Sequence, residues 1–276
     1  MKIGSPEHRD TFCKHFMQTY TEFDPDTLPW PDLDEAALAR LKSVPFWEEV
    51  FYTERRAGAI VAEFVKTIKD PVMKEAVALQ GLEEARHAKL IRVMIEKYGI
   101  DAAERPLEDV SDNVETRFKD FGFGECMDSF LGFGVFKIAM QSEFLPKEMF
   151  TIFETLMYEE TRHIVFFVNW MAYNQAQKGV LARLALPLTD FRYYMRALGR
   201  MVGTAKRGKE FSATQASVFL DGFTFRRFLE DCYSENRRRM GVFDKELLRP
   251  SFLPQLAETA LGAMRLWSFR AKPLPA

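Results

Sequence analysis

The sequence is poor in several features that mark common classes of protein. It has only 3 cysteines, Cys13, Cys126 and Cys232, and this odd, widely spaced set gives no disulfide framework and is typical of a reducing cytoplasm. The 38 basic residues do not outnumber the 40 acidic ones, so no basic surface argues for nucleic acid. The first residues lack the apolar core of a signal peptide, and no window reaches about 18 consecutive apolar residues. We therefore expect a cytoplasmic protein that neither crosses a membrane nor binds nucleic acid.

What the sequence does contain is a motif that occurs twice. The segment EEARH at residues 83–87 recurs as EETRH at residues 159–163, and each copy lies in a long, apolar-rich, helix-compatible segment. Residues three positions apart lie on one face of an α-helix, so Glu84 with His87, and Glu160 with His163, can converge on one point. One such pair is weak evidence of a metal site, whereas two copies in matching contexts are strong evidence.

Breaks in the sequence predict the helices that carry these motifs. The first helix of a bundle is expected from Pro45 to Lys69, and Asp70-Pro71 ends it. The second is expected from Pro71 to Tyr98, before Gly99. Glu54 precedes this turn by about as many residues as Glu84 follows it, so the two carboxylates stand at similar heights. We predict Glu54 as a third carboxylate of the site.

A second pair of helices is expected to supply the fourth carboxylate. One runs from Ser111-Asp112 to about Leu145 and the other from Pro146 to about Gln177. Counting outward from the turn between them places Glu125 or Asp128 opposite Glu160, and leaves Glu143 about 20 Å away. Glu125 is favoured because a long carboxylate bridges two metals more readily, and Asp128 stays as the alternative. Four glycines in this helix, at 122, 124, 132 and 134, point to close packing, room for substrate or a π-bulge.

This pattern resembles the ferritin-like di-iron carboxylate superfamily, in which two helices each give a Glu and two others each give a Glu-x-x-His pair. The resemblance covers residues 45–175. It implies an all-α fold, a ferritin-like four-helix bundle with additional C-terminal helices. It also implies two irons, or manganese or a mixed Fe/Mn pair. The ligands are expected to be Glu54, Glu84, His87, Glu125 (or Asp128), Glu160 and His163.

The residues around the expected ligands also match the superfamily. A metal-bound histidine usually donates its second ring N–H to a carboxylate. The superfamily often has an acid for this purpose one position before the ligating glutamate, which here is Glu83 or Glu159. Arg86 and Arg162 are expected to pair with these two acids. We predict no catalytic residues beyond the metal ligands.

Several branches of the superfamily are disfavoured by single residues. Ribonucleotide reductase small subunits have a tyrosine where Ile91 stands, and rubrerythrins need a CxxC pair that is absent. The aminobenzoate N-oxygenases have a further histidine where Leu156 stands. The resemblance that remains is to non-haem di-iron oxygenases and oxidases that act on a small apolar or aromatic molecule. We expect dioxygen as co-substrate, an external electron donor and a pocket lined by phenylalanine, of which the chain has 26. The alternative is a non-enzymatic iron-storage protein.

The remaining segments are expected to belong to the same domain, residues 1–276. Residues 1–44 form a leader, with short helices at about 6–20 and 34–41, before the metal-binding bundle at 45–176. Residues 178–271 are expected to form accessory helices, one kinked or begun at Pro187, one over 212–240 and one over 254–271. The state of assembly is left open, with a homodimer as one outcome.

Overall fold

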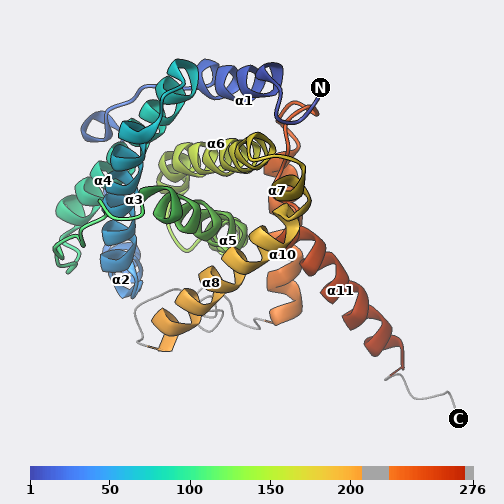
Figure 1. The fold of residues 1–276 in the computed structure, drawn as a ribbon. Coiled ribbons are helices and arrows are strands. Elements are labelled where there is room, and N and C mark those ends of the chain that lie inside the picture. The colour runs from blue at the N-terminus through green and yellow to red at the C-terminus, as the bar shows by residue number, and fades with distance from the viewer. Residues whose placement is uncertain (207–223, 271–276) are drawn as a thin grey trace, which may run out of the picture.

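The computed structural model describes residues 1–206 and 224–270, and within these ranges the chain is helical and has no strand (Figure 1). The helices are α1 (Pro6–Gln18), α2 (Glu35–Ser43), α3 (Trp47–Thr67), α4 (Pro71–Tyr98), α5 (Val114–Gln141), α6 (Lys147–Gln177), α7 (Val180–Leu184), α8 (Leu186–Lys206), α10 (Phe225–Met240) and α11 (Phe252–Arg270), with one 3-10 turn, η1 (Pro25–Thr27). The predicted all-α class is confirmed.

Four long helices form the centre of the molecule. Helix α3 packs on α4, α4 on α6, α6 on α5 and α5 on α3, so that the four helices close a ring (Figure 1). Buried apolar side chains pack between these helices and their neighbours, among them Ile60 and Val61 of α3, Ile91 of α4 and Val165 of α6. The motif glutamates and histidines lie on the inner faces of α4 and α6.

Local signals in the sequence set the ends of these helices. The Asp70 carboxylate accepts a hydrogen bond from the amide of Met73 and caps α4, which begins at Pro71. At the other end Gly99 adopts a left-handed conformation, with φ 59°, which glycine adopts without a steric penalty. Asp34 caps α2 in the same way as Asp70 caps α4. Helix α5 ends at Gln141, before the predicted Leu145, because the chain turns through Glu143 at φ 51°.

The connection between α4 and α5 runs along the bundle, as the two pairs of helices require. It leaves α4 at Ile100, which packs in the same buried cluster as Leu41, and reaches Val110 in the cluster that contains Phe64 at the far end of α3. On the way, Arg105 pairs with Glu48 and Glu49 of α3. These ion pairs fix the connection on the outer side of α3.

Helix α5 is α-helical from Val114 to Gln141 and has no π-bulge. Its four glycines divide into two kinds according to the space around them. A Cβ atom on Gly122 would lie 2.2 Å from Phe167 Cδ2, and one on Gly134 would lie 2.3 Å from Cys232 Sγ. These two positions allow close packing of α5 on α6 and α10. A Cβ on Gly132 would meet nothing within 4 Å, and one on Gly124 would meet only the Arg200 guanidinium at 3.6 Å. Those two positions leave space.

Shorter helices cover the bundle. Helix α1 lies across α4 and α6, while α8 and α10 pack on α5, and α10 also packs on α11 (Figure 1). The predicted kink at Pro187 is a break between α7 and α8. The helix predicted over 212–240 is described only from Phe225, and residues 207–223 and 271–276 lie outside the described part of the chain. No helix in the described residues has the length and apolar character needed to cross a membrane.

Candidate metal centre

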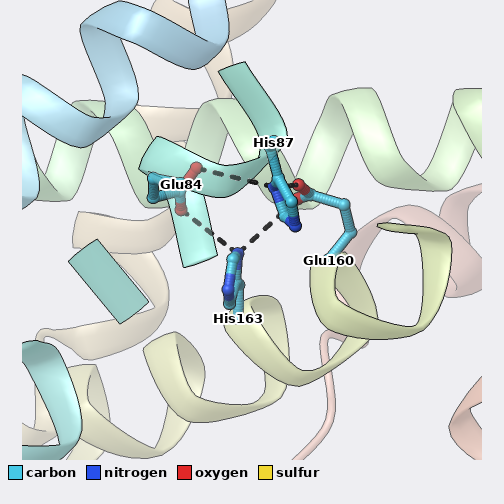
Figure 2. A group of neighbouring side chains, drawn as sticks. All are labelled: Glu84, His87, Glu160 and His163. Carbon is cyan, nitrogen blue, oxygen red and sulfur yellow. Dashed lines mark ion pairs between the residues drawn. The ribbon is translucent and has the colours of Figure 1, made fainter. Parts of the chain in front are cut away.

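Two glutamates and two histidines meet between α4 and α6 (Figure 2). One ligand atom from each of Glu84, His87, Glu160 and His163 can be chosen so that all four atoms lie within 4.8 Å of one another. His87 Nδ1 lies 3.0 Å from Glu160 Oε1, and His163 Nδ1 lies 3.1 Å from Glu84 Oε1. Each histidine therefore faces the glutamate of the other motif, and the two motifs build one cluster. This buried cluster can hold a metal.

The other predicted carboxylates lie around this cluster at different distances. Glu54 Oε2 of α3 is 3.6 Å from His87 Nδ1. Glu125 of α5 has its Oε2 atom shielded from solvent, and the charges of Glu84, Glu160 and Glu54 act on it. Asp128 is exposed at the edge of the same region. Glu143 lies in the turn after α5, away from the cluster, as the helix count required. The structure thus brings Glu54 and Glu125 to the four central residues, and their role as ligands stays a prediction.

Several buried atoms that could bind a metal have no hydrogen-bond partner in the rest of the described chain. Glu84 Oε2 and Glu125 Oε2 are buried and accept no hydrogen bond from the described residues. His87 Nδ1 and His163 Nδ1 are buried as well and face Glu160 and Glu84 of the cluster at 3.0 and 3.1 Å, without the geometry of a hydrogen bond. A buried polar atom without a partner costs about 1–3 kcal/mol. Four such atoms directed at one region fit a site for metal ions, because coordination would satisfy all of them.

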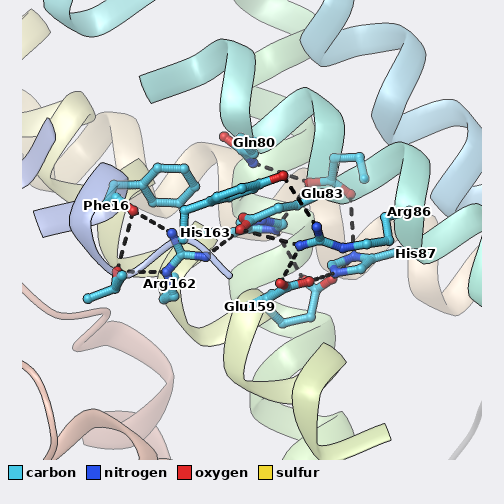
Figure 3. A network of polar contacts seen from close by, with 12 residues as sticks. Phe16, Gln80, Glu83, Arg86, His87, Glu159, Arg162 and His163 are labelled. Carbon is cyan, nitrogen blue, oxygen red and sulfur yellow. Dashed lines mark hydrogen bonds and ion pairs between the residues drawn. The ribbon is translucent and has the colours of Figure 1, made fainter. Parts of the chain in front are cut away.

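Glu83 and Glu159, the acids that precede the two glutamates of the cluster, each contact the histidine of the opposite motif (Figure 3). Glu159 Oε2 lies 2.9 Å from His87 Nε2, and Glu83 Oε2 lies 2.9 Å from His163 Nε2. With Nδ1 directed at the cluster, each imidazole can donate its Nε2–H to one of these carboxylates and hold its ring fixed. The sequence indicated this role for both acids, but it did not show that each acid serves the histidine of the other helix.

Two buried arginines complete this arrangement. Arg86 donates to Glu159 Oε1 at 2.5 Å, and Arg162 donates to Glu83 Oε1 at 2.5 Å. Both outer carboxylates are fully buried, so a charged partner is needed to offset their desolvation. The predicted pairing of the arginines with these acids is present across the two helices, and Arg86 also lies 3.8 Å from the Glu83 carboxylate of its own motif.

Helix α1 and the residues after it contribute contacts that the sequence gave no reason to expect (Figure 3). Arg162 donates to the Phe16 carbonyl at 2.5 Å and to the Thr19 hydroxyl at 2.9 Å, and its guanidinium stacks over the Phe16 ring. The Arg86 guanidinium lies over the Tyr20 and Phe23 rings. The leader therefore covers the outer side of both arginines. Gln80, one turn before Glu84, donates to Glu84 Oε1 at 3.3 Å and was also missed.

The charges of this cluster shift the ionisation of its members. Burial lowers the pKa of His163, but the Glu84 and Glu83 carboxylates outweigh it and raise this pKa to about 10. The pKa of His87 is raised well above its usual value for the same reason, with Glu159 and Glu160 as the main partners. Burial, together with the charges of its neighbours, raises the pKa of Glu125 well above its usual range. Without metal the site therefore retains protons on its imidazoles.

Two cavities lie beside the cluster and share part of their walls. The first has a volume of about 350 Å³, begins at Glu54 and Asp128, and has a mostly apolar wall that includes five phenylalanines. The wall phenylalanines are Phe46, Phe136, Phe144, Phe150 and Phe153. The second has a volume of about 910 Å³, includes Glu125 and Glu160 in its wall, and is mixed in polarity. An apolar space of this size beside a polar cluster is typical of small-molecule sites.

Comparison with protein-family models, curated proteins and solved structures finds no match for this chain.

Proposed function

We propose that the protein is a ferritin-like di-iron oxidoreductase that activates dioxygen and oxidises or oxygenates a small organic molecule. The observation that carries this proposal is that Glu54, whose Oε2 atom lies 3.6 Å from His87 Nδ1 of the cluster, also lines an apolar cavity of about 350 Å³. Carboxylate and imidazole ligands with open positions suit iron(II) that reacts with dioxygen. A site built only to store iron has no use for such a cavity.

The chain's own residues would serve this reaction in three ways. Glu54, Glu84, Glu125 and Glu160 supply four negative charges, which balance two divalent ions, and His87 and His163 supply two neutral donors. Glu83 and Glu159 hold the imidazole rings and their Nε2 protons. The apolar wall of the first cavity keeps water from a substrate beside the metals. Since the chain has no flavin or iron–sulfur motif, the electrons are expected from a separate donor.

Metal content tests the first part of this proposal. Protein expressed in iron-replete medium should contain about two irons, or manganese, per chain by elemental analysis, because four carboxylates neutralise two divalent ions. Replacing His87 and His163 together by alanine should remove most of this metal. His15→Ala is the matched control, because His15 lies on α1 outside the cluster. Unchanged metal content in the double variant would end the proposal.

Oxygen chemistry tests the second part. The protein is loaded anaerobically with two iron(II) per chain and mixed rapidly with oxygen while the visible absorbance is followed. An enzyme should form a transient oxidised species whose decay rate responds to an added substrate. A storage protein should instead consume iron(II) far beyond two per chain and assemble into a large particle by light scattering. Metals that stay unchanged under oxygen would show that the cluster is structural and refute the oxygenase function.

A further inference from the structure

The apolar cavity has a direction. It begins at the cluster, at Glu54 of α3 and Asp128 of α5, and follows α5 as far as Ala139, with Val44 and Leu145 at the end of the bundle also in its wall. Asp128 and Ala139 are eleven positions apart in the helix, which corresponds to about 16 Å along its axis. The cavity is thus an elongated apolar space with the metal centre at one end.

The second cavity extends from the cluster toward the opposite end of α5. Its wall contains four arginines, namely Arg56, Arg117, Arg196 and Arg200. The acidic residues of the wall away from the cluster are Glu49, Glu108 and Asp120. Two of these acids already have basic partners, since Glu49 pairs with Arg105, and Asp120 with both Arg196 and Arg200. The other acids of the wall are Glu54, Glu125, Asp128 and Glu160, which lie at or beside the cluster, and the exposed Glu108. Outside the wall, the charge of Asp109 also acts on Arg117. Toward the far end of the cavity the arginines are thus only partly offset.

Two of the arginines have guanidinium groups available to a ligand. Arg117 donates through Nε to the Asp112 carbonyl, and its two terminal amino groups donate to no residue in the described ranges. The half-buried Arg56 lines the cavity from α3, and its side chain forms no hydrogen bond or ion pair with any residue in the described ranges. A guanidinium group binds a carboxylate or phosphate through two parallel hydrogen bonds. This cavity therefore suits an anionic group.

The two cavities meet at the metal centre and share part of their walls. Glu54, Asp128 and Gly132 line both of them. Gly132 has open space where a Cβ atom would be, so the absence of a side chain there keeps the passage between the cavities wide. A molecule that occupies both cavities must cross this point, next to the cluster.

We propose that the substrate is an anionic amphiphile. Its apolar body fills the cavity along α5, and its anionic head, a carboxylate or a phosphate, lies against Arg56 and Arg117. The bond to be oxidised is then one near the polar end of the apolar body, because that part of the molecule passes the metal centre. This inference rests on the proposed function, and names the class of molecule that the same site accepts.

Binding tests the proposal without any turnover. Calorimetry is done under anaerobic conditions on the iron(II)-loaded protein with n-alkanoates of six to fourteen carbons, with alkyl phosphates, and with n-alkanols and n-alkylamines of equal length. Affinity should rise about fourfold per added methylene, which is the ratio given by about 0.8 kcal/mol per buried CH₂, until the cavity is full. At equal length the anions should bind at least tenfold more tightly than the alcohols and amines. Equal affinity for anion and alcohol, or no dependence on chain length, would overturn the proposal.

Two variants test the binding of the anionic head and of the apolar body separately. Arg56→Gln with Arg117→Gln should remove the preference for the anion and leave the affinity for alkanols unchanged. Gly132→Leu should lower the affinity for long-chain alkanoates at least tenfold and the affinity for short-chain alkanoates little, because leucine fills the passage between the cavities. Gly262→Leu is the matched control, because this helical glycine in α11 also has open space around it and lies outside both cavities. If the Gly132→Leu protein binds long-chain alkanoates as tightly as the unaltered protein, the ligand does not cross the passage at Gly132 and the proposal is wrong.

The outcome is independent of the oxygen experiment. If alkanoates bind as expected but the iron does not react with dioxygen, the site for the amphiphile stands and the oxygenase function fails. If dioxygen reacts at the metals and no amphiphile binds, the function stands and the substrate class is wrong.

Discussion

The crossed pairing of the outer carboxylates can be tested by replacing Glu83 with glutamine. Glutamine keeps the shape of the side chain but loses its charge, and its amide group must direct NH₂ at one of two donors, Arg162 or His163. We expect a less stable protein with weaker metal binding. The metal bound beside His163 should be affected more than the metal beside His87, because Glu83 serves the histidine of the other helix.

The size of both effects follows from burial and contacts. Glu83 is fully buried and Arg162 is 1% exposed, so the guanidinium would be left without a carboxylate in the protein interior. Breaking a buried ion pair in this way costs about 3–5 kcal/mol in the free energy of unfolding. The lower end is expected, because Arg162 keeps its bonds to Phe16 and Thr19. Loss of an outer partner typically weakens metal binding about 10–100-fold.

Urea unfolding of the metal-free protein and competition with a chelator measure these two quantities. Glu75→Gln is the matched control, since Glu75 is exposed on the same helix and should change the free energy of unfolding by less than about 0.5 kcal/mol. In double-mutant cycles, Glu83→Gln should couple to His163→Ala by about 0.5–3 kcal/mol, and more weakly to His87→Ala, which it reaches only through Arg86 and Glu159. Coupling to His87 in place of His163 would refute the crossed arrangement.

Two further predictions concern the ligands and the protons of the site. Glu125→Ala should lower the metal content by about one of two metals per chain in elemental analysis, whereas Asp128→Ala and Glu143→Ala should keep both. Loss of a metal only in Asp128→Ala would show that Asp128, and not Glu125, is the fourth carboxylate ligand. In the metal-free protein, the pKa of His163 is raised from 6.5 to about 10, so the stabilisation it gives is complete below pH 6.5 and is lost as pH rises through 10. The thermal midpoint of metal-free protein should therefore fall over this range by calorimetry, and less so in His163→Ala; an equal fall in both would show that other groups are responsible.

Much of the bundle could be predicted because residues close in sequence determine where its helices begin and end. The Asp70-Pro71 break and the left-handed Gly99 give the ends of α4 to the residue, and a spacing of three residues brings Glu84 and His87 to one face. The comparison of heights along the two helices likewise selected Glu54, whose Oε2 atom lies 3.6 Å from His87 Nδ1 in the structure. These features depend on neighbours in sequence, or on two helices joined by a short turn.

The features that could not be predicted depend on segments far apart in sequence. Helical spacing places Glu83 beside the cluster but does not say which histidine it meets, since this depends on how α4 and α6 face each other. The contact of the Phe16 carbonyl with Arg162 involves a backbone atom, which leaves no signal in the side-chain pattern. The four glycines of α5 look alike in sequence, and only the neighbours in space, such as Phe167 beside Gly122, separate those that pack from those that leave room.

The crossed pairs also fix how far α4 and α6 can slide past each other. Each helix carries one outer carboxylate, and that carboxylate contacts an arginine and a histidine of the other helix. The four contacts have lengths of 2.5–2.9 Å. A displacement by one helical turn, about 5.4 Å, would separate all four contacts at once. It would leave two acids and two guanidinium groups buried without partners, at a cost of several kcal/mol for each. The apolar residues around the motifs tolerate such a shift far better, so alignment of the two helices is decided by the charged residues between them.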